Sequence, residues 1–172
     1  LEFRSLAWTG DEVGYRLRPE RYSNHLRKLL DRWPANVVIL GFGLNESFAG
    51  EAGVDTFRED LQSYLREMKR RHPGASLVVL SPIATEDLKH PYYPEIGRRN
   101  SEIRSYVRIM SKVSSERGAR FVDLFTPSLA AYAQQEAPLT SNGIHLNDQG
   151  YAMIAKALSR ELLGEETYAK LD

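Results

Sequence analysis

The stretch "NVVILGF", residues 36–42, decides the fold class. It is apolar without interruption from Val37 to Leu40 and rich in β-branched side chains. A strand with one face in water alternates apolar and polar residues, whereas a strand covered on both faces forms a continuous apolar run. The stretch therefore predicts a buried strand of a parallel sheet. "SLVVLSP" (76–82) and "RFVDLF" (120–125) predict two further strands, and "FRSLAW" (3–8) is a candidate for an earlier one.

Amphipathic segments lie between these strands. Apolar residues recur at helical spacing, and Pro34, Pro73 and Gly164 mark the ends of three of the segments. The predicted helices cover residues 21–33, 56–72, 103–113 and 151–162. The second of them has Thr56 and Glu59 at the spacing of a capping box. Strands that alternate with helices predict one α/β domain over residues 1–172, with a parallel sheet covered on both faces.

Composition excludes several classes of function. Lys and Arg together number 23, as do Asp and Glu, so no net charge attracts the chain to nucleic acid or to an anionic membrane. No apolar run approaches the roughly 18–20 residues that a membrane span requires. The sequence contains no cysteine, which excludes disulfides, thiolate metal sites and a cysteine nucleophile.

In parallel sheets, ligands bind at the carboxyl ends of the strands. Asn45 follows the strand at 36–42, and its amide can donate two hydrogen bonds. A neutral donor there suits an oxyanion hole, which stabilises negative charge on a carbonyl oxygen. An asparagine that accommodates a tight turn is an equally good reading. Gly10, after the candidate strand at 3–8, offers a backbone N–H for the same task, although a Gly-Asp pair is more often only a turn.

The segment "TSNGIHLNDQGY", residues 140–151, places His145 in a loop just before the last predicted helix. Asn147 or Asp148 is expected to cap that helix. A single histidine is most often structural or simply exposed. The other three histidines show no metal-ligand spacing with His145, so no metal site is predicted; they are His25, His72 and His90.

Taken together, "SLAWTGDE", "GLNE" and "NGIHLNDQGY" resemble blocks two, three and five of the SGNH hydrolases, also called the GDSL esterase/lipase family. The resemblance covers essentially the whole chain. It implies a flavodoxin-like three-layer α/β/α sandwich that hydrolyses acetyl or other acyl esters of carbohydrates, lipids or small molecules without a metal or cofactor. It also implies that Gly10 and Asn45 form the oxyanion hole and that His145 is the general base.

The first block of the family is not found in these residues. In the family a hydrophobic strand followed by Gly-Asp-Ser carries the nucleophile, and no Gly-Asp-Ser occurs in the chain. Neither Ser47 nor Ser141 sits on a strand-to-helix elbow, so we expect the serine, and the first strand of the fold, upstream of Leu1. An isolated chain without that strand is expected to be poorly stable or prone to aggregate, because unpaired buried backbone groups are costly.

A second departure concerns the partner of the histidine. The family has Asp-x-x-His, whereas this chain has Asn142 three residues before His145. An asparagine oxygen can accept from the ring N–H but adds no charge. We therefore expect a Ser-His dyad assisted by Asn142, with Asp148 and Asp123 as fallback carboxylates.

Two functions from different classes remain open. The first is an ester hydrolase, and the second is a non-catalytic module of the same fold that binds carbohydrate or acyl groups. The loop at 84–100 is a candidate for substrate recognition, through sugar stacking on Tyr92 and Tyr93 or an anionic group at Arg98 or Arg99. An ordinary surface loop explains it equally well. The sequence leaves the compartment open, and export or a periplasmic location is compatible with it.

Overall fold

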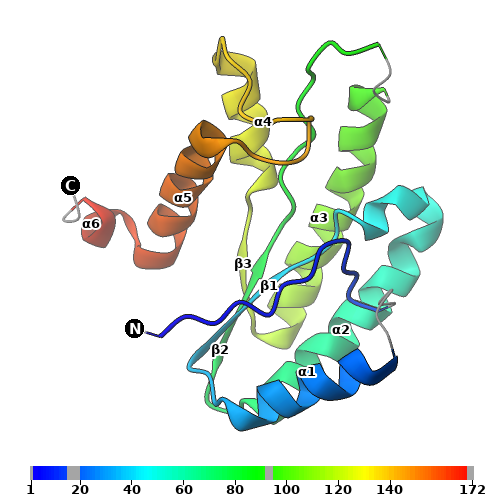
Figure 1. The fold of residues 1–172 in the computed structure, drawn as a ribbon, viewed down its shortest axis with the longest axis vertical. Coiled ribbons are helices and arrows are strands. Elements are labelled where there is room, and N and C mark those ends of the chain that lie inside the picture. Colours follow the sequence, from blue (N-terminus) through cyan, green and yellow to red (C-terminus); the bar gives the residue numbers. More distant parts are fainter. Residues whose placement is uncertain (1, 15–19, 92–94, 170–172) are drawn as a thin grey trace.

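A computed structural model describes residues 2–14, 20–91 and 95–169. Helices and short strands alternate along the chain (Figure 1). In order, the elements are α1 (Glu20–Arg32), β1 (Val37–Gly41), the 3-10 helix η1 (Glu46–Gly53), α2 (Val54–Arg71), β2 (Ser76–Leu80), α3 (Ile96–Arg117), β3 (Arg120–Val122), α4 (Phe125–Gln134), α5 (Asp148–Leu163) and α6 (Glu165–Tyr168).

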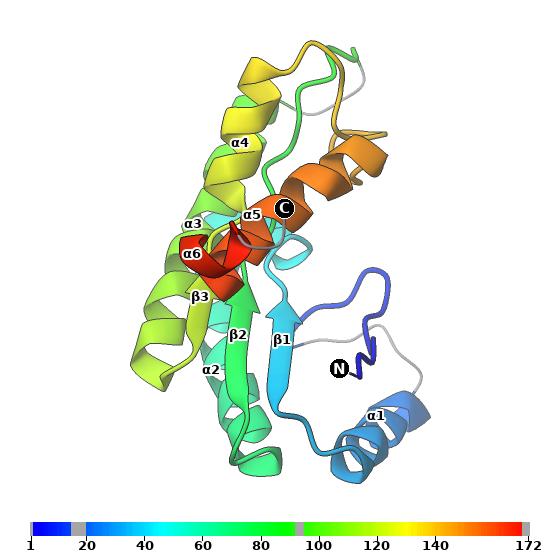
Figure 2. The ribbon, with the colours of Figure 1, turned by 90° about the vertical axis from the view of Figure 1, so that its left-hand side faces the viewer.

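The described strands form one parallel sheet in the order β1-β2-β3. Val37 pairs with Ser76, and the register continues along both strands to Gly41 and Leu80. β2 pairs with β3 in the same direction, with Leu80 opposite Val122 at the end. All three strands run the same way (Figure 2), so the loops that follow them meet at one edge of the sheet.

Helices cover both faces of the sheet, which confirms the predicted three layers. On one face, α2 and α3 pack against Leu40 and Val79 of the sheet. The α2 stripe in this core is fully apolar and buried: Phe57, Leu61, Leu65 and Met68. On the other face, α5 contributes Ile154, Leu158 and Leu162 to a cluster with Val78, Val122 and Leu124.

β1 differs from the strand that its sequence predicts. Burial on both faces is correct for β2, in which Leu77, Val78 and Val79 are all buried. In β1, however, Val37 is 53% and Ile39 is 44% exposed. The reason is that the described contacts of α5 lie over β2 and β3, so the corresponding face of β1 has no helix over it in the described part of the chain.

The prediction of a strand at residues 3–8 is wrong. This segment is irregular, and within the described residues it pairs with no strand. It passes near β1 without extending the sheet (Figure 2). Phe3 is 79% and Trp8 49% exposed. A segment becomes a strand only where a neighbouring strand supplies hydrogen bonds, and within the described residues no strand pairs with this one.

Two local details of the helices also differ from the predictions. α2 begins at Val54, directly after η1, and Gly53 precedes it without a side-chain cap, so the capping box at Thr56 does not form. α4 was not predicted, and the strand expected to reach residue 125 ends at Val122. Asp123 explains the early end, because its Oδ1 accepts from the N–H groups of Phe125 and Thr126 and so starts α4.

None of the helices in the described residues has both the length and the apolar character needed to cross a membrane.

Candidate active site

The two segments predicted to form an oxyanion hole lie together. Gly10 is in a turn with φ +73°, closed by a hydrogen bond from Asp11 N–H to Trp8 O at 3.3 Å. The Asn45 side chain donates from Nδ2 to Asp11 O at 2.9 Å. One amide hydrogen of Asn45 therefore fixes the side chain beside the Gly10 turn, and the second is available to a ligand.

A partly buried carboxylate that the sequence did not single out holds the same two segments. Glu46 accepts hydrogen bonds from Val13 N–H and Gly43 N–H, both at 2.8 Å. Burial raises the pKa of Glu46 above its ordinary value of 4.5, and the two N–H groups offset part of that effect. Gly43 has φ +99°, and a Cβ there would lie 2.9 Å from Met110 Sδ, so the turn requires glycine.

His145 lies in the loop before α5, and its ring contacts Asn142. The imidazole Nδ1 is 3.0 Å from Asn142 Oδ1 and 2.9 Å from Asn142 Nδ2. Asn142 Oδ1 also accepts from the backbone N–H of His145 at 2.9 Å and of Ile144 at 3.3 Å. Those two donors place the amide oxygen on the histidine side, where it can accept from an Nδ1–H. The ring nitrogen Nε2 has no hydrogen bond within the described residues.

The start of α5 fixes the carboxyl-terminal end of this loop. Asn147 is the N-cap, as predicted in one of the two alternatives, and its Oδ1 accepts from Gly150 N–H at 3.0 Å. Asn147 N–H in turn donates to Leu139 O at 3.0 Å. A Cβ on Gly150 would lie 2.1 Å from Leu139 O, so only glycine lets the helix approach so closely.

The alternative residues have other contacts. Ser47 is fully buried and donates to Leu44 O at 2.6 Å, which removes it as a nucleophile. Ser141 Oγ donates to the backbone oxygen of His145 at 3.2 Å, away from the ring. Asp123 accepts from the Phe125 N–H at the start of α4 and from the Thr126 hydroxyl. Asp148 lies in the first turn of α5.

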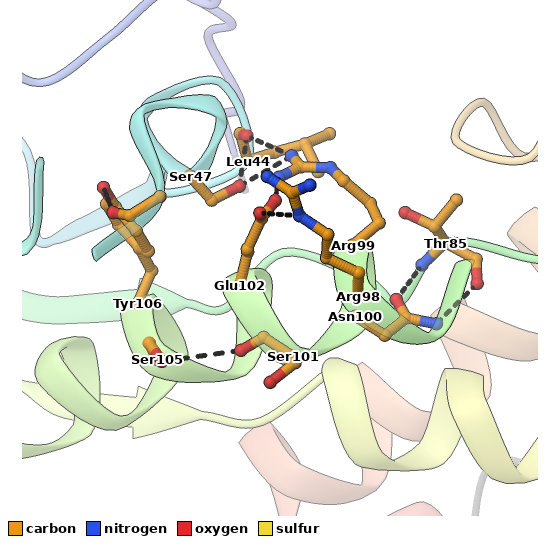
Figure 3. A network of polar contacts seen from close by, with 11 residues as sticks. Leu44, Ser47, Thr85, Arg98, Arg99, Asn100, Ser101, Glu102, Ser105 and Tyr106 are labelled. Atoms are coloured by element: carbon orange, nitrogen blue, oxygen red, sulfur yellow. Dashed lines mark hydrogen bonds and ion pairs between the residues drawn. The ribbon is translucent and has the colours of Figure 1, made fainter. Parts of the chain in front are cut away.

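The expectation that Arg99 meets an anionic substrate group is wrong. Arg99 is 4% exposed and points inward from α3, where it donates to Leu44 O at 2.9 Å and to Ser47 Oγ at 2.7 Å (Figure 3). It supports the loop that carries Asn45. Arg98 is exposed and pairs with Glu102. Tyr92 and Tyr93 lie outside the described residues.

The two halves of the site lie at the carboxyl end of the sheet, one beside the loop after β1 and the other beside the loop after β2. Within the ranges that the structure describes, no hydrogen bond joins His145 to Gly10 or to Asn45. Nor does that part of the chain contain three or more His, Asp or Glu side chains grouped to hold a metal ion.

The sequence pattern of the GDSL-like Lipase/Acylhydrolase family matches residues 2–153. The chain belongs to this family. A comparison with curated proteins gave no match. Among solved structures, the chain is similar to an acetylxylan esterase from Geobacillus stearothermophilus, with 16% identity, a TM-score of 0.64 and coverage of 89% of this chain and 68% of that one. It is also similar to the lipase/acylhydrolase from Enterococcus faecalis, with 21% identity, a TM-score of 0.61 and coverage of 90% and 72%.

The family match confirms the GDSL resemblance, and the solved structures confirm the α/β fold. At 16% and 21% identity, the two solved structures establish the fold alone. Acyl-ester hydrolysis is the reaction class that the family name carries. The roles of single residues rest on the geometry of this chain.

Proposed function

We propose that this GDSL family member hydrolyses acyl esters by acyl transfer to a serine that lies N-terminal to Leu1. His145 is the general base, Asn142 orients its ring, and Gly10 and Asn45 bind the oxyanion. The observation that carries the proposal is the contact between Asn142 and His145 Nδ1, which leaves Nε2 for proton transfer. The Asn45 amide beside the Gly10 turn supports the oxyanion assignment.

The chemistry uses each group in a defined step. The serine oxygen attacks the ester carbonyl carbon while Nε2 of His145 takes the hydroxyl proton. Negative charge moves to the carbonyl oxygen, where Gly10 N–H and the second amide hydrogen of Asn45 stabilise it. The carbon–oxygen bond of the leaving alcohol then breaks, and His145 gives that alcohol its proton. A water molecule repeats the sequence on the acyl-serine and releases the acid.

The proposed substrate is an acetyl or other short acyl ester of a carbohydrate or a small molecule. The similarity to an acetylxylan esterase supports this choice. The Arg99 guanidinium is buried, so it does not bind an anionic group of the substrate.

Substitution of the two central side chains in a protein that includes the proposed upstream serine tests the proposal. With 4-nitrophenyl acetate, Asn45→Ala is expected to lower kcat by about 10²–10³, the usual cost of one oxyanion donor. His145→Ala is expected to lower kcat at least as much, because the serine then loses its base. Asn36→Ala, at the exposed amino end of β1, serves as the control. Wild-type kcat in either site variant would overturn the assignment.

A non-catalytic module that binds carbohydrate or acyl groups is the second candidate. The asparagine at position 142 and the absence of Gly-Asp-Ser from residues 1–172 favour it. Binding of an acetylated oligosaccharide by calorimetry, with no turnover in the longer protein, would replace the first proposal with this one.

A further inference from the structure

Glu86 is a buried carboxylate that the proposed reaction does not use. It follows β2 and is only 6% exposed. Its carboxylate oxygens accept from Leu139 N–H at 3.0 and 3.1 Å and from Thr140 N–H at 2.7 Å, and the Thr140 hydroxyl donates to it as well. Hydrogen bonds to a buried carboxylate are strong and costly to remove, so this contact has a substantial effect on the local structure.

Glu86 is connected to the histidine loop, residues 140–145, through its side chain and through its backbone. Thr140 Oγ1, while it donates to Glu86, accepts from Gly143 N–H at 3.0 Å. Glu86 also donates its own backbone N–H to Gly143 O at 2.8 Å. Ser141 N–H closes the loop on His145 O at 2.8 Å. Glu86 therefore fixes the short turn that carries Asn142 and His145.

The loop of Glu86 is itself fixed by α3. Asn100 accepts from Thr85 N–H at 2.7 Å and donates to Thr85 O at 2.9 Å, a pair of bonds that mimics a strand partner (Figure 3). The neighbouring Arg99 holds Leu44, next to Asn45. The first turns of α3 thus hold the loop that carries Asn45 directly. They hold the histidine loop indirectly, through Thr85 and Glu86.

We propose that Glu86 is a positioning residue for His145, which holds the turn at 140–145 so that Asn142 meets the imidazole Nδ1. The expected effect of Glu86 on kcat rests on the proposed function. The expected effect on the orientation of the His145 ring does not. The hydrogen bonds explain why a carboxylate is needed. Three donors converge on Glu86, and a glutamine would turn its NH₂ group toward at least one of them.

The test compares Glu86→Gln with Asp87→Asn in the protein that includes the proposed upstream serine. Asp87 is the matched control, since its exposed side chain binds Lys89 in the same loop. Long-range ¹H–¹⁵N spectra report the tautomer of His145 without requiring activity. We expect one dominant tautomer in the wild type and in Asp87→Asn, and a mixture in Glu86→Gln. In steady-state kinetics we expect kcat to fall by about 10–100-fold in Glu86→Gln, with KM within about twofold.

The outcomes separate the two proposals. A folded Glu86→Gln protein with wild-type His145 signals and kcat would overturn the positioning role. Altered His145 signals in a protein without esterase activity would support that role and contradict the proposed function. If Glu86→Gln fails to fold, Thr140→Val is the second variant, because it removes the hydroxyl between Glu86 and Gly143 N–H. Thr140→Val should then show the same tautomer mixture and Thr140→Ser the wild-type spectrum; wild-type spectra for both would overturn the proposal.

Discussion

At the scale of single residues, Asn142 is the most informative departure from the family pattern. Its Oδ1 accepts from two backbone N–H groups of the turn and also faces His145 Nδ1. An asparagine in this position fixes the direction of the ring through the backbone. In the proposed reaction it cannot stabilise the imidazolium that forms when His145 takes the serine proton, because an amide has no charge.

Asn142→Asp is therefore expected to raise kcat. The carboxylate keeps the same backbone contacts and adds a negative charge beside Nδ1. In the serine-protease template that the reaction resembles, an Asp-to-Asn change costs about 10⁴ in kcat, so we expect the reverse change to gain about tenfold or more. The measurement is kcat at pH 8 in the protein with the proposed serine. A fall in kcat would show that the amide itself is required.

Glu46 gives a prediction for the pH dependence of stability. Because burial raises its pKa in the folded protein, the folded state keeps a proton that the unfolded state has already lost. The free energy of unfolding therefore decreases as pH rises from about 4.5 through the folded-state pKa. Glu46→Gln removes this effect, since its side chain does not titrate.

Urea unfolding of the wild type and of Glu46→Gln at pH 4, 5, 6 and 7 measures this effect. The free energy of unfolding of the wild type, minus that of the variant, should become smaller as pH rises. A difference that grows with pH would mean that the N–H groups of Val13 and Gly43 outweigh burial.

The sequence predicted some of these residues and not others. His145 and Asn45 can be found because their neighbours form recognisable blocks at strand ends. Glu46, Glu86 and Arg99 carry no such local pattern, since the groups they bind are mostly distant along the chain. Arg99 is misleading in the sequence, because a charged residue is expected at the surface unless a buried acceptor is known.

At the scale of elements, β2 and α2 follow directly from their apolar patterns, whereas the segment at 3–8 does not. β2 is paired on both edges and covered on both faces, so its composition and its environment agree. Residues 3–8 were predicted as a strand from their composition, but within the described part of the chain they pair with no strand. A strand forms only where a neighbouring strand pairs with it, so the composition of one segment does not predict it.

The bare face of β1 predicts association of the isolated 172-residue chain. Val37 and Ile39 expose apolar side chains on a strand whose outer edge is unpaired within the described residues. Exposed apolar strands of this kind promote aggregation. The double variant Val37→Thr and Ile39→Thr keeps high β-propensity and is expected to aggregate several-fold more slowly at 37 °C by light scattering.

Urea unfolding provides the control for this prediction. Because both side chains are exposed, the double variant should change the free energy of unfolding by no more than about 1 kcal/mol. Equal aggregation rates in the two proteins would show that the face of β1 is not the associating surface.

At the scale of the whole molecule, alternation of strands and helices was enough to predict the layered architecture. The strand direction places the Asn45 loop and the Glu86 loop at the carboxyl end of the sheet. Hydrogen bonds then hold the Gly10 turn beside Asn45 and the His145 loop beside Glu86. The alternation of strands and helices did not predict which residues hold these loops in place. The first turns of α3 do so: they bind Leu44, next to Asn45, and they bind Thr85, whose neighbour Glu86 holds the histidine loop.

The central claim is that His145 activates a serine outside residues 1–172 for acyl transfer. The most direct measurement is labelling of a longer protein, with the residues before Leu1 included, by a fluorophosphonate, followed by peptide mapping. The account predicts one labelled serine N-terminal to Leu1, and labelling that is at least about 100-fold slower in His145→Ala. A label within residues 1–172, or none in a folded protein, would contradict it.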